Sequence, residues 1–328
     1  MSLPNPLEAA ETAAPVGGAK GPRRPRRGVA ADSTNWLGAI VFFGPAAVLL
    51  GIFLVFPTVY SIALSFNRGR RGEFTEWVGL DNFVTLFTKD PNFINLSTFP
   101  PSGAVWNNVL WIIFYTGFVL AFGLIVATLA ARVRYEAVIK AIVFLPMAIA
   151  ATALAVIWKF VYAPDANIGL LNAVLGIVNF GPISWLGDVS FVNAALIAAG
   201  TWASVGFATV ILSAALKGIP AEVLEAARTD GANERQIFFR IILPMVSLPM
   251  SVLAVTLIVN VIKLFDLIYV MTNGGPGTSS RVIGYTFFVE GFQAGLFGKS
   301  AAIAMVMLIV LIPIMIFNIR RFRTASVV

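Results

Sequence analysis

The chain has 328 residues, of which 58% are hydrophobic and 12% are charged, whereas an average soluble domain has about 45–50% and about 25%; a soluble enzyme of this length could not keep such a surface in water. Because the sequence contains no cysteine and no histidine, it excludes thiol nucleophiles, disulfides, imidazole bases and metal sites built from those two residues. The net charge is +7, and a mean hydropathy of +0.87 indicates that membrane topology, rather than nucleic-acid binding, explains the basic excess.

The first 35 residues are rich in alanine, proline and glycine and carry a basic run. Such a composition cannot bury enough apolar surface to fold, so we expect a disordered, basic cytoplasmic tail over residues 1–35. Attraction to an anionic membrane surface is worth about 1 kcal/mol per basic residue, which makes membrane lipid the expected partner of this tail, with no nucleic acid. The run consists of Arg23, Arg24, Arg26 and Arg27.

Six apolar stretches follow, each long enough to cross a hydrocarbon core of about 30 Å as a helix of about 20 residues. Backbone polar groups cannot remain unpaired in lipid, so these stretches are helices rather than strands. Pro57 is a candidate for a bend in the first, which is longer than a straight crossing requires. The sequence therefore predicts an all-α, polytopic membrane protein with six transmembrane helices in one domain, residues 36–319. The spans are expected at residues 36–66, 105–131, 141–161, 192–216, 244–271 and 301–317.

Lysine and arginine are distributed unevenly between the segments that connect these spans. Fifteen of them lie in the two terminal tails and in the second and fourth connections, whereas six lie in the other connections. Cytoplasmic segments of membrane proteins carry the basic excess. We therefore expect both termini in the cytoplasm, with a short C-terminal tail at residues 320–328.

Two outer connections have some structure of their own. Residues 67–104 hold several aromatic side chains among charged ones, including Phe74, Trp77, Phe83, Phe87 and Phe93, and this segment is too short to be an independent domain. We expect it to fold against the membrane face or a partner. Residues 168–180 read as a short apolar helix that lies at the outer interface or re-enters slightly.

The cytoplasmic connection at residues 217–243 predicts two short helices with a sharp turn between them. Pro220 suits the first turn of a helix, and Gly231 suits its end because glycine adopts the left-handed conformation without a Cβ penalty. Asn233 followed by Gln236 has the spacing of a capping box, so a second helix should start there and lead into the fifth span. The first helix either rests on the membrane surface as an amphipathic connector or docks in the groove of a partner.

Polar residues at membrane depth mark a second candidate site. Lys263 and Asp266 are three residues apart in the expected fifth span, so they should share one helix face and could pair, with Asn260 extending the strip. This strip is either a structural salt bridge or part of a solute path. Trp202 in the fourth span offers the flat apolar surface that hydroxyl-rich ligands need. Two alternative functions remain open. The protein could be an ion-coupled secondary transporter with a Lys263/Asp266 relay, or a non-transporting membrane scaffold.

The cytoplasmic connection also carries a family signature. Glu225-Ala226-Ala227, then Gly231, then Ile241 and Leu243-Pro244, resembles the EAA motif of permease subunits of bacterial ABC importers. The resemblance implies that the first helix is a coupling helix held in a groove of a cytoplasmic ATPase. The coupling residues that it implies are Glu222, Glu225, Ala226, Ala227, Arg228, Asp230 and Gly231.

Further patches resemble the sugar-importing branch of that family. They are residues 79–83, the stretch from Leu145-Pro146 to Trp158-Lys159, and residues 272–277 after the fifth span. The closing segments 298–302 and 318–323 are similar to alpha-glucoside permeases. The chain differs from maltose-type subunits because it lacks their extra N-terminal spans and large external insertion.

The resemblance implies a type I importer of an oligosaccharide in the bacterial cytoplasmic (inner) membrane. Its expected partners are a second permease subunit, two ATPase subunits and an extracytoplasmic sugar-binding protein. The chain itself is expected to be no enzyme and to hold no cofactor or metal, because the ATPases bind ATP and Mg. By their distance from Glu225, the positions Trp202, Ser204 and Phe207 correspond to the sugar path of maltose-type relatives, with Asn260, Lys263 and Asp266 as further candidates.

Overall fold

The computed structural model describes residues 36–70, 73–97 and 99–325. Within these ranges the chain is helical with isolated β-bridges and no strand, which confirms the all-α prediction. Four helices are long and apolar enough to cross a membrane, and six crossings result if each of two bent helix pairs is one span. The tail predicted at residues 1–35 lies outside the described residues. The chain divides into two compact units, one that ends at Phe56 and one that begins at Pro57.

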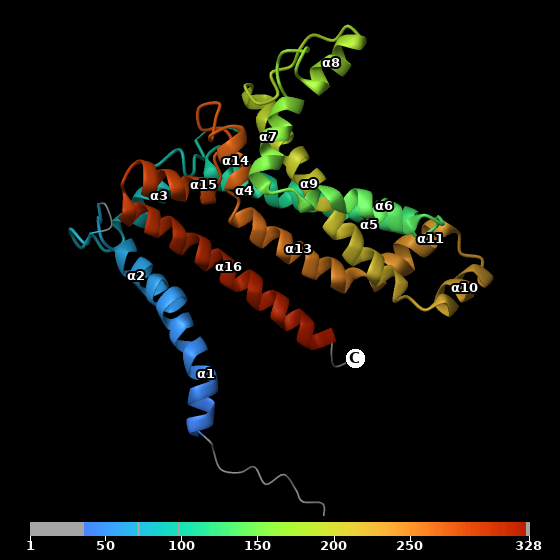
Figure 1. The fold of residues 1–328 in the computed structure, drawn as a ribbon, viewed down its shortest axis with the longest axis horizontal. Helices are drawn as coiled ribbons and strands as arrows, with labels where there is room; N and C mark the ends of the chain where they lie inside the picture. Colours follow the sequence, from blue (N-terminus) through green and yellow to red (C-terminus); the bar gives the residue numbers. More distant parts are fainter. Residues whose placement is uncertain (1–35, 71–72, 98, 326–328) are drawn as a thin grey trace, which may run out of the picture. The chain divides into compact units, whose positions relative to one another are not determined.

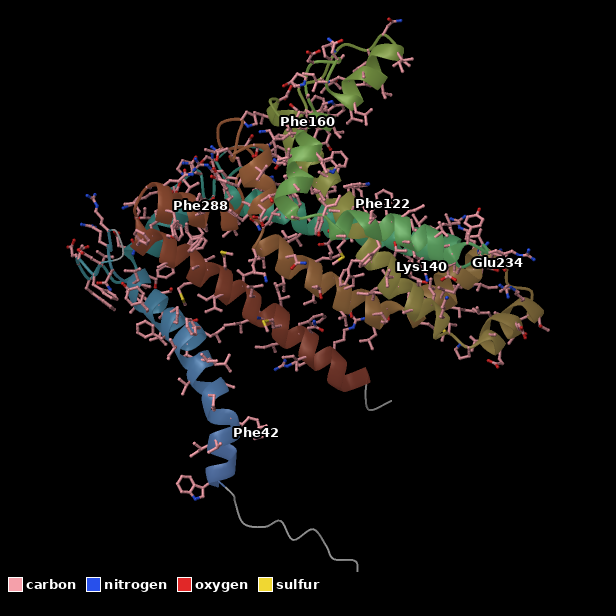
Figure 2. The ribbon with its side chains drawn as sticks, in the orientation of Figure 1. Phe42, Phe122, Lys140, Phe160, Glu234 and Phe288 are labelled. Carbon is pink, nitrogen blue, oxygen red and sulfur yellow. The ribbon has the colours of Figure 1, made fainter. Side chains whose placement is uncertain are left out.

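The first unit contains one apolar helix, α1 (Trp36–Leu50), followed by a π-helical turn, η1 (Gly51–Val55). The wider turn comes just before Pro57, whose missing N–H leaves one helix carbonyl without its usual partner. Large apolar side chains of this helix are exposed, and Phe42, which Figure 2 labels, has 85% of its surface free. Lipid or another chain must cover them in a membrane.

The second unit holds the remaining helices, which Figure 1 draws from blue (α2) to red. They include three π-helical turns, η2, η4 and η5, and one 3₁₀ turn, η3. In chain order the elements are α2 (Phe56–Ser65), α3 (Asp81–Thr88), α4 (Ala104–Leu110), η2 (Trp111–Tyr115), α5 (Thr116–Ala130), α6 (Glu136–Phe144), η3 (Leu145–Ala148), α7 (Ala151–Val161), α8 (Leu170–Ile177), α9 (Val189–Lys217), α10 (Ala221–Thr229), α11 (Glu234–Ile237), η4 (Phe238–Ile242), α12 (Leu243–Met245), α13 (Ser247–Ile262), α14 (Asp266–Met271), α15 (Ile283–Phe288), η5 (Val289–Gln293) and α16 (Phe297–Ala325).

The second and fourth spans pack against each other at the centre of this unit. The second span runs from α4 through α5, and the fourth is the single helix α9, close to the predicted ranges 105–131 and 192–216. Small residues face each other between them, since a Cβ added at Gly123 would lie 2.6 Å from the Cβ of Ala208. Small residues let helix backbones approach closely in a membrane, where packing drives association.

The third span is not the straight helix predicted at residues 141–161. It begins at Glu136 and turns by 100° between η3 and α7. Pro146 lies in the 3₁₀ turn, and Ile149 and Ala150 are extended, so the helical hydrogen-bond ladder ends there. Beyond the bend, α7 packs against α14 and α9.

The fifth span also differs from the predicted continuous helix at residues 244–271. It begins at Glu234, bends by 64° before α13 and ends at Ile262. Residues 263–265 are non-helical and α14 starts a new helix at Asp266. Lys263 and Asp266 therefore lie on two elements, and the described residues show no ion pair between them. The predicted shared face and pairing were wrong.

Tertiary contacts explain why the helix stops at Ile262. The backbone at residues 262–264 presses against α15, where a Cβ on Gly284 would lie 2.7 Å from the carbonyl oxygen of Leu264. Asn108 in α4 donates its Nδ2 to the carbonyl oxygen of Val261 at 3.1 Å and accepts the N–H of Ile283 at 2.7 Å. A polar side chain thus adds a second hydrogen bond to the Val261 carbonyl, which also accepts the N–H of Leu264 at 3.1 Å where the helix ends.

The segment 67–104 packs against helices of its own chain. Its helix α3 packs against α16 around a small core that includes Leu86 and Ile303, both 0% exposed. Lys299 at the start of α16 lies 2.7 Å from a carboxylate oxygen of Asp90 and 2.9 Å from one of Glu290. The predicted apolar helix at residues 168–180 is present as α8.

Replacing Asn108 by alanine is expected to lower the free energy of unfolding by about 1–3 kcal/mol, because it leaves the buried N–H of Ile283 without its partner. The measurement is the thermal unfolding midpoint of the purified protein in detergent. Asn167→Ala, at an exposed turn, is the matched control and should change little. Equal midpoints for the two variants would contradict the anchoring role of Asn108.

Candidate functional site

The connection at residues 217–243 has the helix, turn and second helix that its sequence predicts. Pro220 precedes α10, and Gly231, with φ of 83°, follows its end. Asn233 and Gln236 form a capping box in which each side chain accepts the other's backbone N–H at 2.9 Å. Figure 1 shows α10 beyond the end of α9, away from α4, α14 and α15, so α10 lies at one end of the helices and the 272–283 loop at the other.

One face of α10 is turned away from the rest of the chain. Glu222, Glu225 and Ala226 are exposed, whereas Leu224 and Ala227 are half-buried. Among the described residues, the carboxylates of Glu222 and Glu225 have no hydrogen-bond or ion-pair partner. This face therefore offers two free negative charges beside a small side chain, which suits docking to a basic partner.

The other predicted coupling residues have different roles. The Nε of Arg228 lies 3.0 Å from a carboxylate oxygen of Glu234 at the start of α11. Asp230 is exposed at the end of α10. The structure thus separates outward-facing residues from Arg228, which ties α10 to the fifth span.

A pocket of about 230 Å³ lies between the second, third, fourth and fifth spans, next to the bend in the third. The Tyr115 hydroxyl and the Ser204 hydroxyl are hydrogen-bonded at 2.8 Å on its wall. The ring of Trp111 lies beside that of Tyr115, with centroids 5.6 Å apart, and its indole N–H is buried without a hydrogen-bond partner. Asn260 contributes an amide. Aromatic faces with a few polar groups are the composition expected of a site for a hydroxyl-rich ligand.

The pocket unites two of the six residues that the sequence suggested for a solute path, Ser204 and Asn260. Phe207 is half-buried against the main apolar core. Lys263 and Asp266 are exposed at the broken end of the fifth span. These three residues lie outside the pocket lining.

Trp202 points to the opposite side of α9. It is 42% exposed and its ring meets that of Trp158 edge-on at 5.6 Å. It lines an open, apolar groove of about 1140 Å³ that also carries the rings of Phe114, Phe118 and Phe122. Figure 2 labels Phe122 on this stretch of α5. Lipid chains or an apolar helix suit such a surface better than a sugar does.

Sequence reasoning missed Trp111 and Tyr115. Both lie on the second span, whereas the EAA motif lies in the connection between the fourth and fifth spans, at residues 217–243. Nothing in that motif pointed to them. Their spacing of four residues places them on one helix face, and each combines an aromatic ring with a polar group. That combination inside an apolar span was the available signal.

Comparisons with known proteins agree with this geometry. Residues 119–322 match the family model described as "Binding-protein-dependent transport system inner membrane component". The osmoprotective compounds uptake permease protein GgtC of Synechocystis sp. is 44% identical over 86% of this chain and 98% of its own length. The alpha-glucoside transport system permease protein AglF of Rhizobium meliloti is 40% identical over 85% of this chain and 81% of its own.

A solved structure shares the fold. A chain of a bacterial ABC transporter involved in the import of the acidic polysaccharide alginate superposes with a TM-score of 0.73 and 23% identity, covering 88% of this chain and 96% of that one. The predicted importer permease fold is confirmed. The family match covers most of the chain, so the protein belongs to the family of binding-protein-dependent transport system inner membrane components.

Proposed function

We propose that this protein is the transmembrane permease subunit of an ATP-driven ABC importer for an oligosaccharide, with an alpha-glucoside as the first candidate. The observation that carries the proposal is α10, a capped helix between the fourth and fifth spans with two carboxylates and a small residue on its outward face. The names of the relatives that transport osmoprotective compounds and alpha-glucosides support the choice of solute.

In this proposal α10 docks in a groove of a cytoplasmic ATPase, where Glu225 faces a basic residue. The ATPase binds and hydrolyses ATP with Mg, and this chain holds no nucleotide, cofactor or metal. Because α10 is tied to both the fourth and the fifth span, closure of the ATPases would rotate these spans and give alternating access.

The solute is proposed to pass along the pocket of Trp111, Tyr115, Ser204 and Asn260. A sugar ring would lie against the aromatic faces, and its hydroxyls would exchange hydrogen bonds with the tyrosine, serine and asparagine side chains. The pocket adjoins the bend between η3 and α7, so a movement of α9 relative to that bend would open or close it.

The remaining parts of the importer are also proposals. A second, similar permease completes the pathway, two ATPases lie below it, and an extracytoplasmic binding protein delivers the sugar; the description of the family as binding-protein-dependent supports the last of these. Both termini are placed in the cytoplasm because of the distribution of basic residues. A proton or sodium relay through Lys263 and Asp266 loses its support, since Lys263 lies in the non-helical turn after Ile262 and Asp266 begins a new helix.

Replacing Asn260 by leucine is expected to raise the KM of uptake about five- to tenfold, the loss of roughly one solute hydrogen bond. The measurement is uptake of labelled alpha-glucosides by proteoliposomes that contain the whole importer, ATP and the binding protein. Thr256→Val is the control, because Thr256 lies one turn away and bonds only to the carbonyl of Val252. Uptake that persists without ATP, or that an uncoupler abolishes at constant ATP, would contradict the proposed function.

A further inference from the structure

We propose that the short cytoplasmic connection between the second and third spans, residues 131–136, is a charged clamp that holds both ends of the α10 segment. This inference rests on the proposed function, because it assigns residues that link α10 to the third span as well as to its own two spans. None of the coupling residues that the family signature implies lies in this connection.

The first end of the clamp is Glu136, the first residue of α6. One of its carboxylate oxygens lies 3.0 Å from the Nζ of Lys217 and accepts a hydrogen bond from the Ser213 hydroxyl at 3.3 Å. Lys140, one turn further along α6, also pairs with it. Lys217 is the last residue of α9. Glu136 therefore binds the chain where the fourth span ends and the α10 segment begins.

The second end of the clamp is Arg132. Its guanidinium lies 3.5 Å from one carboxylate oxygen of Glu234, and the other oxygen of Glu234 lies 3.0 Å from the Nε of Arg228 in α10. Glu234 is the first residue of α11. Glu234 therefore joins the clamp, α10 and the start of the fifth span at one point.

The two groups of ion pairs are joined through one short stretch of backbone, residues 132–136. Arg132 and Glu136 are four residues apart in the chain, and the segment that they hold, residues 218–233, contains all of α10. Figure 2 shows the labelled Lys140 and Glu234 at the same end of the helices, beside α10 and α11. Each carboxylate meets two cations, and its negative charge offsets the repulsion between them.

This arrangement has a mechanical consequence. A force on α10 reaches the fourth span through Lys217 and the fifth through Glu234, and the clamp passes it on to α6, whose far end is the bend beside the pocket. The Arg132–Glu234 and Arg228–Glu234 pairs are exposed, and such pairs contribute little to stability, about 0–1 kcal/mol each. Glu136 is half-buried, but its partner Lys217 is exposed. The expected effect of removing them is therefore on coupling rather than on folding.

Arg132→Gln and Glu136→Gln are each expected to lower solute-stimulated ATP hydrolysis by about two- to fivefold in the reconstituted importer, and the double variant by more. Arg134→Gln is the matched control, because Arg134 is an exposed arginine of the same connection without an ion pair among the described residues. Stimulated hydrolysis equal to that of the control in all three variants would overturn the proposal.

A covalent link provides a second test that a merely structural role would not pass. The chain has no cysteine, so Glu136→Cys combined with Lys217→Cys introduces the only two thiols of this subunit. The open pair should show the reduced stimulation of the charge variants. Joining it with a short bis-maleimide, which adds one cysteine thiol across each of its two double bonds, should restore stimulation, since the clamp stays closed during transport. A joined pair that stops turnover would overturn the clamp.

The two proposals fail in different ways. Glu225→Lys in the same preparation tests docking of α10 itself. If Glu225→Lys uncouples the importer while the Arg132 and Glu136 variants resemble the control, the clamp is wrong and the coupling function stands. If Glu225→Lys has no effect, the proposed coupling function is wrong, and the clamp, which rests on it, is wrong as well.

Discussion

Replacing Glu225 by lysine is expected to abolish solute-stimulated ATP hydrolysis while membrane insertion stays intact. Glu225 is exposed on the outward face of α10 and has no side-chain partner among the described residues, so the substitution costs the isolated chain little. In the docked complex the same carboxylate would lie against a cation, and a charge pair in an interface that loses one partner costs about 2–5 kcal/mol. Reversal adds repulsion, so stimulation should fall by at least about 100-fold.

The assay compares basal and solute-stimulated ATP hydrolysis of the complete importer in lipid. Glu225→Gln keeps the shape and removes the charge, so its stimulation should lie between that of the wild type and that of Glu225→Lys. Arg134→Glu changes the charge of the connection between the second and third spans by the same amount with the opposite sign, and this variant should remain stimulated. If Glu225→Lys remained as stimulated as Arg134→Glu, α10 would not be the coupling element.

The turn chemistry around α10 could be predicted because its causes are local. Pro220 fixes the entry, Gly231 takes the positive φ that ends the helix, and the Asn233 and Gln236 side chains bond to backbone groups three residues away. None of these features depends on the rest of the fold. Helix ends of this kind are therefore readable from a short stretch of sequence.

The interruption after Ile262 could not be predicted, because its causes are distant in sequence. Asn108, 153 residues earlier, binds the carbonyl of Val261, and Gly284 allows α15 to press on the chain where the helix stops. Residues 263–271 remain apolar enough to continue a helix. Hydropathy therefore merged two helices into one span and placed Lys263 and Asp266 on one face.

The separation of Trp202 from Ser204 is of another kind, because the sequence contained the means to predict it. Successive helix residues are about 100° apart, so Trp202 and Ser204 point in nearly opposite directions on α9. The structure places Ser204 in the pocket and Trp202 in the apolar groove. The distance of a residue from the family motif predicts its position along the helix. The direction in which its side chain points must be predicted from the helical period.

Adding a single methyl group at Gly206 is expected to have a large effect on the fold. Gly206 lies in α9 where α6 crosses it, and a Cβ there would lie 2.3 Å from the carbonyl oxygen of Val143 and 2.6 Å from the Cα of Phe144. Both neighbours are backbone atoms, so α6 itself must move. Overpacking in cores costs typically about 1–3 kcal/mol, and a forced backbone shift places Gly206→Ala at the upper end of this range.

The matched control is Gly117→Ala in α5, where an added Cβ meets nothing within 4 Å. Alanine is favoured over glycine in a helix by about 1 kcal/mol, so this variant should be as stable as the wild type or more so. The measurement is the temperature at which half of the detergent-purified chain loses its monodisperse elution. Because α6 leads directly into the bend beside the pocket, Gly206→Ala should also lose uptake in full importers at temperatures below that midpoint. A midpoint equal to that of Gly117→Ala would show that α6 and α9 do not approach as closely as this packing requires.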